Sequence, residues 1–224
     1  MKCQRPISTF LSILVSALSV VNPFSSAVRG GPANPTPGQQ IPEEAYRLND
    51  AGKTHFDKKE YDKAIELLLR AIQLAPNYAE AYKNLAVVYT GKREYEKSIS
   101  YALKAIEMTP EDGEYHAVLA SAYYWMNDLD KAITAFRKAI QLGDRRAKVY
   151  SVLGNTYLKK EMLQEAITAF KKALELDPSL QGARNNLRMA EEMKRSRKCD
   201  LESGSNANGS GSGHRQITVG LAAH

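Results

Sequence analysis

The chain has few residues suited to covalent or metal chemistry. Only two cysteines occur, Cys3 in an N-terminal segment and Cys199 near the other end, so we expect packing and not an internal disulfide to hold the fold together. No histidine or cysteine pair has the spacing of a zinc site, and no nucleophile stands near a plausible base. We therefore expect a non-enzymatic protein that has no metal and no cofactor.

One short stretch imitates a phosphate-binding loop. Residues 50–54 read DAGKT, but the first glycine of such a loop would stand where the chain has Arg47, and no strand pattern precedes it. Close packing between two helices is the better explanation for Gly52. The stretch therefore predicts no nucleotide site.

Long apolar runs are absent beyond the N-terminal segment. There, Lys2 and Arg5 precede ISTFLSILVSALSVV, a run shorter than the roughly 20 residues of a membrane-spanning helix, and Ser25 and Ala27 supply small residues for cleavage. We expect residues 1–27 to be a signal peptide and the chain to be exported, either periplasmic or secreted, without stable membrane insertion once the signal is removed. The alternative is a membrane anchor formed by an uncleaved N-terminal segment.

Both flanks of the central region have linker-like composition. Residues 28–44 are rich in proline and glycine and predict a linker, since they cannot bury enough apolar surface to order themselves. Residues 200–224 include GSNANGSGSG and predict a disordered tail. A helical pattern fills the region between them.

In that central region, one amphipathic sequence pattern occurs four times. YDKAIELLLRAIQLAPNY begins at Tyr61, and related lines begin at Tyr95, Leu129 and Leu163, each 34 residues after the one before. Each line follows another helical stripe, as in the second unit, where the first helix aligns Tyr82, Leu85, Ala86 and Tyr89 on one face. A fixed period of this length is typical of stacked-repeat proteins.

This pattern resembles the tetratricopeptide repeat (TPR). In each unit of the family, the first helix carries, in order, a bulky residue, a leucine, a glycine or alanine, and a tyrosine. The second helix carries an alanine, then a phenylalanine or tyrosine, then another alanine, and a proline closes the unit. The resemblance implies an all-α fold, a right-handed superhelical solenoid of helix-turn-helix repeats with units at 45–78, 79–112, 113–146 and 147–180. It also implies a capping helix at 181–199 that covers the last apolar face. Gly143 and Asp144 replace the proline turn that closes the other units, which puts local rigidity in doubt.

In the family, the first helices line a concave groove that binds peptides. We carry the family's groove positions over to this chain residue by residue. In the first unit they are Asn49, Asp50 and Lys53. In the later units and the last helix they are Lys83, Asn84, Val87, Val118, Ser121, Tyr124, Trp125, Ser151, Asn155 and Asn185. Asparagine amides both donate and accept, so they suit a peptide backbone. Tyr124 and Trp125 could act as anchors, although Trp125 could instead pack on Met126.

These expectations favour a protein-interaction scaffold that binds a protein or an extended peptide segment. The alternative is structural self-association through the solenoid end faces, giving a homo-oligomer. The clamp with which chaperone-binding TPR domains hold a terminal carboxylate is incomplete, since only Lys83 and Lys148 match in one frame and only Asn84 in the other. No nucleic-acid partner is expected, because Glu191 and Glu192 interrupt the basic last helix and the net charge is only +6.

Overall fold

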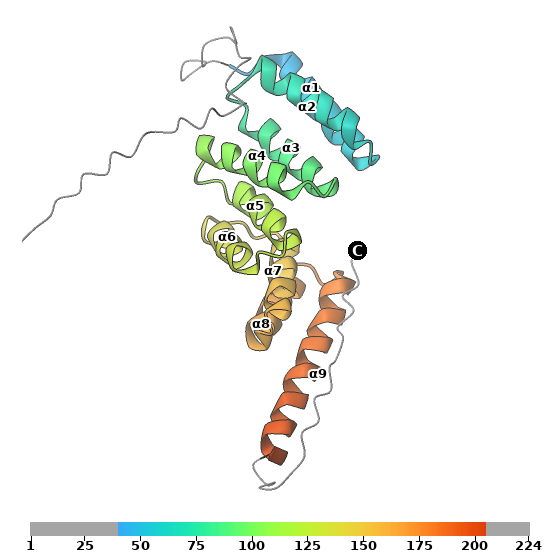
Figure 1. The fold of residues 1–224 in the computed structure, drawn as a ribbon, viewed down its shortest axis with the longest axis vertical. Coiled ribbons are helices and arrows are strands. Elements are labelled where there is room, and N and C mark those ends of the chain that lie inside the picture. The colour runs from blue at the N-terminus through green and yellow to red at the C-terminus, as the bar shows by residue number, and fades with distance from the viewer. Residues whose placement is uncertain (1–39, 205–224) are drawn as a thin grey trace, which may run out of the picture. The chain divides into compact units, whose positions relative to one another are not determined.

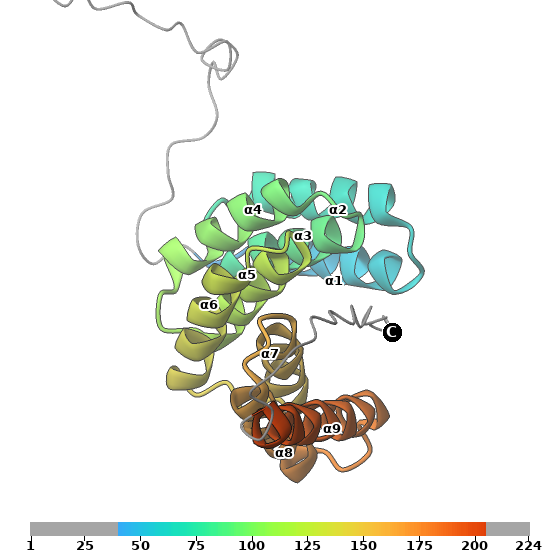
Figure 2. The same ribbon diagram turned by 60° about the horizontal axis from the view of Figure 1, so that its bottom comes forward.

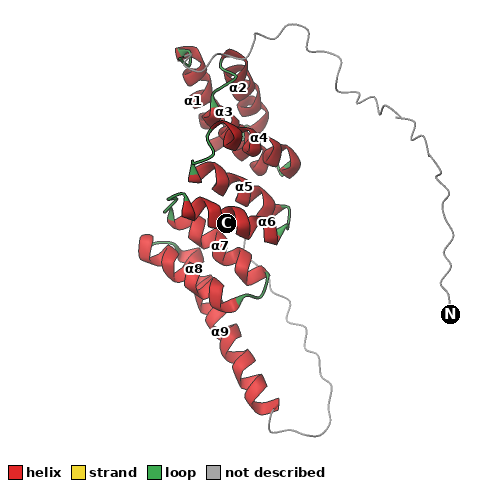
Figure 3. Ribbon diagram, turned by 90° about the vertical axis from the view of Figure 1, so that its left-hand side faces the viewer, coloured by secondary structure: helices red, strands yellow, loops and turns green. Residues whose placement is uncertain are grey.

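The computed structural model describes residues 40–204, which all belong to one compact unit (Figure 1). The predicted signal peptide at 1–27, most of the predicted linker and the tail beyond residue 204 lie outside the described residues. Within 40–204 the structure consists of helices and short loops and has no strand (Figure 3).

The helices pair in chain order. Their bounds are α1 (Glu43–Asp57), α2 (Tyr61–Leu74), α3 (Ala79–Gly91), α4 (Tyr95–Met108), α5 (Gly113–Trp125), α6 (Leu129–Gln141), α7 (Ala147–Lys159), α8 (Leu163–Leu176) and α9 (Gln181–Gly204). Each helix packs on its neighbours in sequence, and α1, α3, α5, α7 and α9 also contact one another in succession. The predicted all-α repeat solenoid is confirmed.

The turn inside each helix pair has the same backbone conformation. Lys59, Arg93, Asn127 and Glu161 all have positive φ, from 59° to 65°, and they recur at the sequence period of the units. In the first turn, the next N–H, that of Glu60, donates to the carbonyl of His55 at 2.9 Å. Such a left-handed residue ends a helix by satisfying its last carbonyls. The period therefore appears in the backbone as well as in the side chains.

Small residues allow the two helices of a unit to approach closely. Gly154 on α7 lies against Phe170 on α8, and a Cβ added to the glycine would come within 2.6 Å of the ring. Gly52 takes the equivalent place in the first unit, where the added Cβ would come within 2.7 Å of Leu68. Phe170 and Leu68 are both fully buried. The glycine of the DAGKT stretch thus has the packing role expected from the sequence.

Helix α9 covers the apolar side of the last unit. Ala183 and Ala190 are buried, and partly buried residues such as Leu187 pack on the main core. The helix begins at Gln181 but ends at Gly204, beyond the expected end at residue 199. Because no proline or glycine occurs between Arg197 and Gly204, nothing in the sequence ends the helix earlier, and the first residues assigned to the tail are helical.

Helix α1 begins at Glu43, inside the region predicted to be linker. Glu43 and Glu44 lie in its first turn, where carboxylates interact favourably with the helix dipole. Of the helices between residues 40 and 204, none has both the length and the apolar character needed to cross a bilayer.

Candidate peptide-binding groove

The first helices of the units lie along the inner side of the helical array. Figure 2 shows α1, α3, α5 and α7 on the inside of an arc, with α2, α4 and α6 on the outside. The sequence-predicted groove residues of the four units are on these inner helices, while Asn185 lies exposed on α9. Three contacts between neighbouring inner helices decide what this surface offers a ligand.

The contact between α1 and α3 is closed by buried amides. Asn84 Nδ2 donates to Asn49 Oδ1 at 2.8 Å, and Asn49 Nδ2 donates to Tyr78 Oη at 3.2 Å. Burial, with Glu80 nearby, raises the pKa of Tyr78 to about 12, so its hydroxyl stays protonated. We call this set the amide joint. Asn84 therefore holds two units together. Only the part of its amide that is not bonded to Asn49 is left for the predicted contact with a peptide.

The next contact, between α3 and α5, is ionic. The buried Lys83 extends its Nζ to Glu114 Oε1 at 3.4 Å and to Glu80 Oε1 at 3.6 Å. Arg146, just before α7, donates to the same Glu114 oxygen at 2.9 Å and pairs with Asp144 at 2.6 Å. Hydrogen bonding to Asp144 raises the pKa of Arg146 further. A chain of alternating charges thus links the start of α3 to the start of α7.

The middle of the contact between α5 and α7 is hollow. A slot of about 150 Å³ opens there, and we call it the α5/α7 slot; it is lined by Ala117, Val118, Ser121, Phe136, Arg146, Lys148, Val149 and Val152. Ala117 and Val152 occupy the same two repeat positions as Asn49 and Asn84 of the amide joint. Replacing two amides with a methyl group and an isopropyl group leaves an apolar gap where the other joint is filled. The predicted residues Val118 and Ser121 line this slot.

Beside the slot, an open polar hollow of about 570 Å³ adjoins the starts of α5 and α7. The loops before both helices line it, including Glu111, Asp112 and Asp144, and it shares Arg146 with the slot. Asp112 is engaged in capping α5, because its side chain accepts from the N–H of Glu114 at 2.8 Å.

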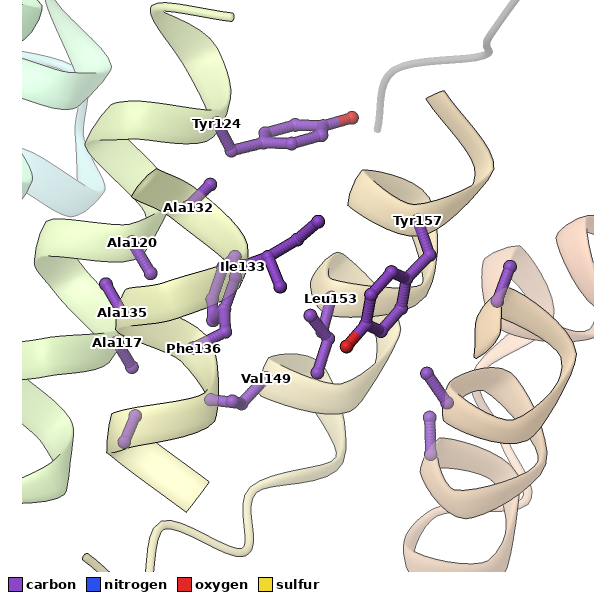
Figure 4. Close-up of a cluster of buried hydrophobic side chains, with 14 of the residues drawn as sticks. Ala117, Ala120, Tyr124, Ala132, Ile133, Ala135, Phe136, Val149, Leu153 and Tyr157 are labelled. Atoms are coloured by element: carbon purple, nitrogen blue, oxygen red, sulfur yellow. The ribbon is translucent and has the colours of Figure 1, made fainter. Parts of the chain in front are cut away.

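Beyond the slot, toward the ends of α5 and α7, aromatic side chains meet a lysine. Tyr124 reaches from α5 toward the last turn of α7 (Figure 4), and Lys159 Nζ lies 4.2 Å from the centre of its ring. Trp125 packs edge-on against Tyr124, with ring centres 5.2 Å apart, and is 48% exposed. Burial lowers the pKa of Lys159 and raises that of Tyr124. Tyr124 is mostly buried, so Trp125 offers the larger free aromatic surface.

The remaining predicted residues have mixed surroundings. Asn155 Oδ1 accepts from Asn186 Nδ2 of α9 at 2.7 Å, so it also joins two helices. Val87 and Ser151 are half-buried. The structure thus places Val118 and Ser121 in the lining of the slot and Tyr124 and Trp125 beyond it at the end of α5, whereas Asn84 and Asn155 are hydrogen-bonded to neighbouring helices.

Sequence reasoning did not single out the Glu114–Arg146–Asp144 link or Lys159. A signal for both was present: Asp144 replaces a proline, and the segment from Ala147 to Lys159 contains lysines but no acidic residue. Among residues 40–204, no three histidine, cysteine or acidic side chains gather as metal ligands would.

Comparison with known proteins identifies the repeats. Models described as tetratricopeptide repeat match residues 79–112, 113–145 and 147–180, and one described as TPR repeat matches residues 52–92. No curated protein matches the chain significantly.

Several solved structures share the fold. MamA is 24% identical, with 73% of this chain and 89% of that chain covered and a TM-score of 0.59. A thermophilic TPR protein of Thermus thermophilus is 24% identical, with coverage of 66% and 82% and a TM-score of 0.59. The TPR protein YrrB is 22% identical, with coverage of 70% and 81% and a TM-score of 0.55. The repeat matches run from residue 52 to residue 180, more than half of the chain, and the chain therefore belongs to the tetratricopeptide repeat family.

Proposed function

We propose that the protein is a non-enzymatic scaffold that binds a protein or an extended peptide segment in the groove formed by its inner helices. TPR proteins generally act as interaction modules, and the related YrrB is described as having an unusual peptide-binding site. The observation that carries the proposal is the α5/α7 slot, a mainly apolar gap between two inner helices, one of which, α5, ends in the half-exposed Trp125. Concave apolar sites that include a few polar groups are the usual form of binding sites.

Self-association through end faces receives less support from the described residues. Helix α1, at the first end, carries exposed ion pairs between Glu43 and Arg47 at 3.4 Å and between Asp50 and Lys53 at 3.5 Å. At the other end, α9 covers the last apolar face. Stable interfaces between subunits are usually more apolar than such surfaces.

Site-directed photocrosslinking tests the proposal. A photoreactive amino acid replaces Trp125 on the inner face in one variant and Leu103 on α4 in the matched control, because both side chains are about half exposed, 48% and 47%. We expect one discrete crosslinked product from position 125 in the native host and none from position 103. Equal crosslinking from both positions would contradict groove binding, and crosslinks between two copies of this chain would favour self-association.

We also propose that the mature protein is exported, on the basis of the N-terminal sequence pattern alone. N-terminal sequencing of the protein recovered from an envelope or secreted fraction tests this. We expect a mature chain that starts near residue 28. An intact N-terminus in a membrane fraction would favour the uncleaved anchor instead.

A further inference from the structure

The charged residues of the inner helices differ in whether they have partners. On α1 and α3, Arg47, Lys53 and Lys83 each lie within 3.6 Å of a carboxylate oxygen. On α7, Lys148 and Lys159 have no such partner among the described residues, and the helix contains no acidic residue. This helix therefore carries two positive charges that have no carboxylate partner among the described residues, although Lys159 lies over the ring of Tyr124.

One of these two lysines lines the α5/α7 slot, and the other lies beyond the slot, toward the end of α7. Lys148 lines the slot beside Arg146, and Lys159 lies over Tyr124 at the last turn of α7. Along α7 their separation is roughly 16 Å, at about 1.5 Å per residue. An extended peptide rises about 3.3 Å per residue and its side chains alternate between two faces, so residues i and i+4 point to the same side about 13 Å apart, and the long lysine side chains can cover the remaining distance.

The α5/α7 slot is mainly apolar and small. Its lining includes Val118, Val149 and Val152, and its volume of about 150 Å³ has room for one apolar side chain such as leucine. Glu114 and Asp144 are already paired with Arg146, which lines the slot, so they are compensated before a ligand arrives.

A bound carboxylate would compensate each lysine. Lys159 sits in a partly desolvated position, where an unpaired charge is costly and an opposite charge is favoured. Its neighbour Trp125 offers half its surface for the adjoining backbone of a peptide. Charge, spacing and slot size therefore describe one kind of ligand.

We propose that the groove between α5 and α7 binds an extended acidic peptide in which one aliphatic side chain lies midway between two carboxylate side chains four residues apart, so that all three point to the same side. This inference rests on the proposed groove function and names its ligand. The two lysines are too far apart to hold one terminal carboxylate together, so recognition uses internal side chains and does not require a chain end.

The test is direct binding of a synthetic hexapeptide to the full chain. The peptide has blocked ends, a fluorophore, glutamates at its first and fifth positions and a leucine at its third, so that the three side chains share one face when the peptide is extended. We expect saturable binding, measured by fluorescence anisotropy. The double variant Lys148→Ala with Lys159→Ala removes both charge-assisted contacts, so its affinity for the peptide should be lower by about tenfold or more. The matched control is Lys58→Ala with Lys138→Ala, which removes the same charge from side chains that have no ion pair among the described residues. We expect the control to bind normally.

Changes in the peptide avoid any effect on folding. Replacing both glutamates with glutamine, or the leucine with glycine, should each weaken binding to the unaltered protein. On the protein side, Ala117→Asn with Val152→Asn places the amide pair of the other joint in the slot and should block the leucine. Equal binding to the lysine variant and its control, or equal binding of the glutamine peptide, would overturn the inference.

The result remains distinguishable from a failure of the proposed function. If position 125 crosslinks a partner but the acidic peptide does not bind, the groove function stands and the ligand assignment is wrong. If neither occurs, both are wrong.

Discussion

The contact between α1 and α3 and the contact between α5 and α7 use the same two repeat positions in opposite ways. In the first, Asn49 and Asn84 fill the contact with a hydrogen bond of 2.8 Å. In the second, Ala117 and Val152 leave a slot of about 150 Å³. The side chains at these two positions thus determine whether the contact between two inner helices is filled by hydrogen-bonded amides or left open. The arrangement of the helices around the contact is the same in both places.

The turns before these contacts differ as well. Pro76 precedes α3, whereas Gly143, with φ of 93°, and Asp144 precede α7. Without the proline, Asp144 fixes the turn by accepting from the backbone N–H of Arg146 at 3.0 Å. Helix α6 also packs less extensively on α7 than α2 does on α3. The third unit therefore meets the fourth through a buried apolar cluster that includes Phe136 and Val149 (Figure 4), and polar contacts and a gap lie beside it.

The largest effect should come from filling the close contact inside a unit. We expect Gly154→Ala to lower the free energy of unfolding by about 2 to 3 kcal/mol, because the new methyl group would overlap the buried ring of Phe170. Gly52→Ala should cost less, since Leu68 is smaller and has more rotamers than a ring. Urea unfolding of both variants checks this order. Equal losses of unfolding free energy in the two variants would show that the first and fourth units pack alike.

Opening the amide joint should have the next largest effect. Asn49→Ala leaves Asn84 Nδ2 and Tyr78 Oη without their partner, and we expect a loss of about 1 to 2 kcal/mol. Asn49→Ala with Asn84→Val copies the pair of the α5/α7 slot and should cost less than the sum of the two single changes. A double-mutant cycle measures this coupling. Strict additivity of the two single changes would show that the hydrogen bond between Asn49 and Asn84 contributes nothing to stability.

Breaking the ionic link should cost less. Arg146→Ala leaves Asp144, whose side chain is 3% exposed, with a backbone partner only, and we expect a loss of about 1 kcal/mol. Thermal unfolding in low and high salt measures it. The difference from wild type should shrink at high salt, and a salt-independent difference would assign the effect to packing instead.

The smallest effect should appear as a pH dependence at Lys159. Burial lowers the pKa of Lys159 below its ordinary value of 10.5, so the unfolded chain holds this proton more tightly than the folded chain. Stability should therefore rise as the pH increases from the folded pKa to 10.5, and the charged lysine should weaken the fold below that range. Lys159→Met should be slightly more stable than wild type at neutral pH and lose this advantage at high pH. An advantage that persists unchanged at high pH would exclude charge as its cause.

The sequence predicted the parts of the fold that follow from its period. Small residues such as Gly52 and Gly154 recur with the repeat, and packing is the same in each unit, so the helix pairs could be derived. The junctions could not be derived in the same way, because contacts such as Asn49 with Asn84 join residues of different units in three dimensions. Of the groove positions carried over from the family, Val118 and Ser121 line the slot and Trp125 is half exposed. Asn84, which was given the same role, is hydrogen-bonded to Asn49 of the preceding unit.

The nearest-neighbour contacts of the helices also bear on how the chain folds. Among the described residues each helix packs only on helices of its own or the adjoining units, so native contacts close short loops and should form quickly. Such an array need not unfold in one step, and it should divide where the coupling between neighbours is weakest. We expect that place to be the boundary between α6 and α7, so that amide hydrogen exchange would show two blocks of protection separated near Gly143. Uniform protection across that boundary would mean that the smaller contact between α6 and α7, with its shared apolar cluster, transmits cooperativity as well as the more extensive contacts between the other units do.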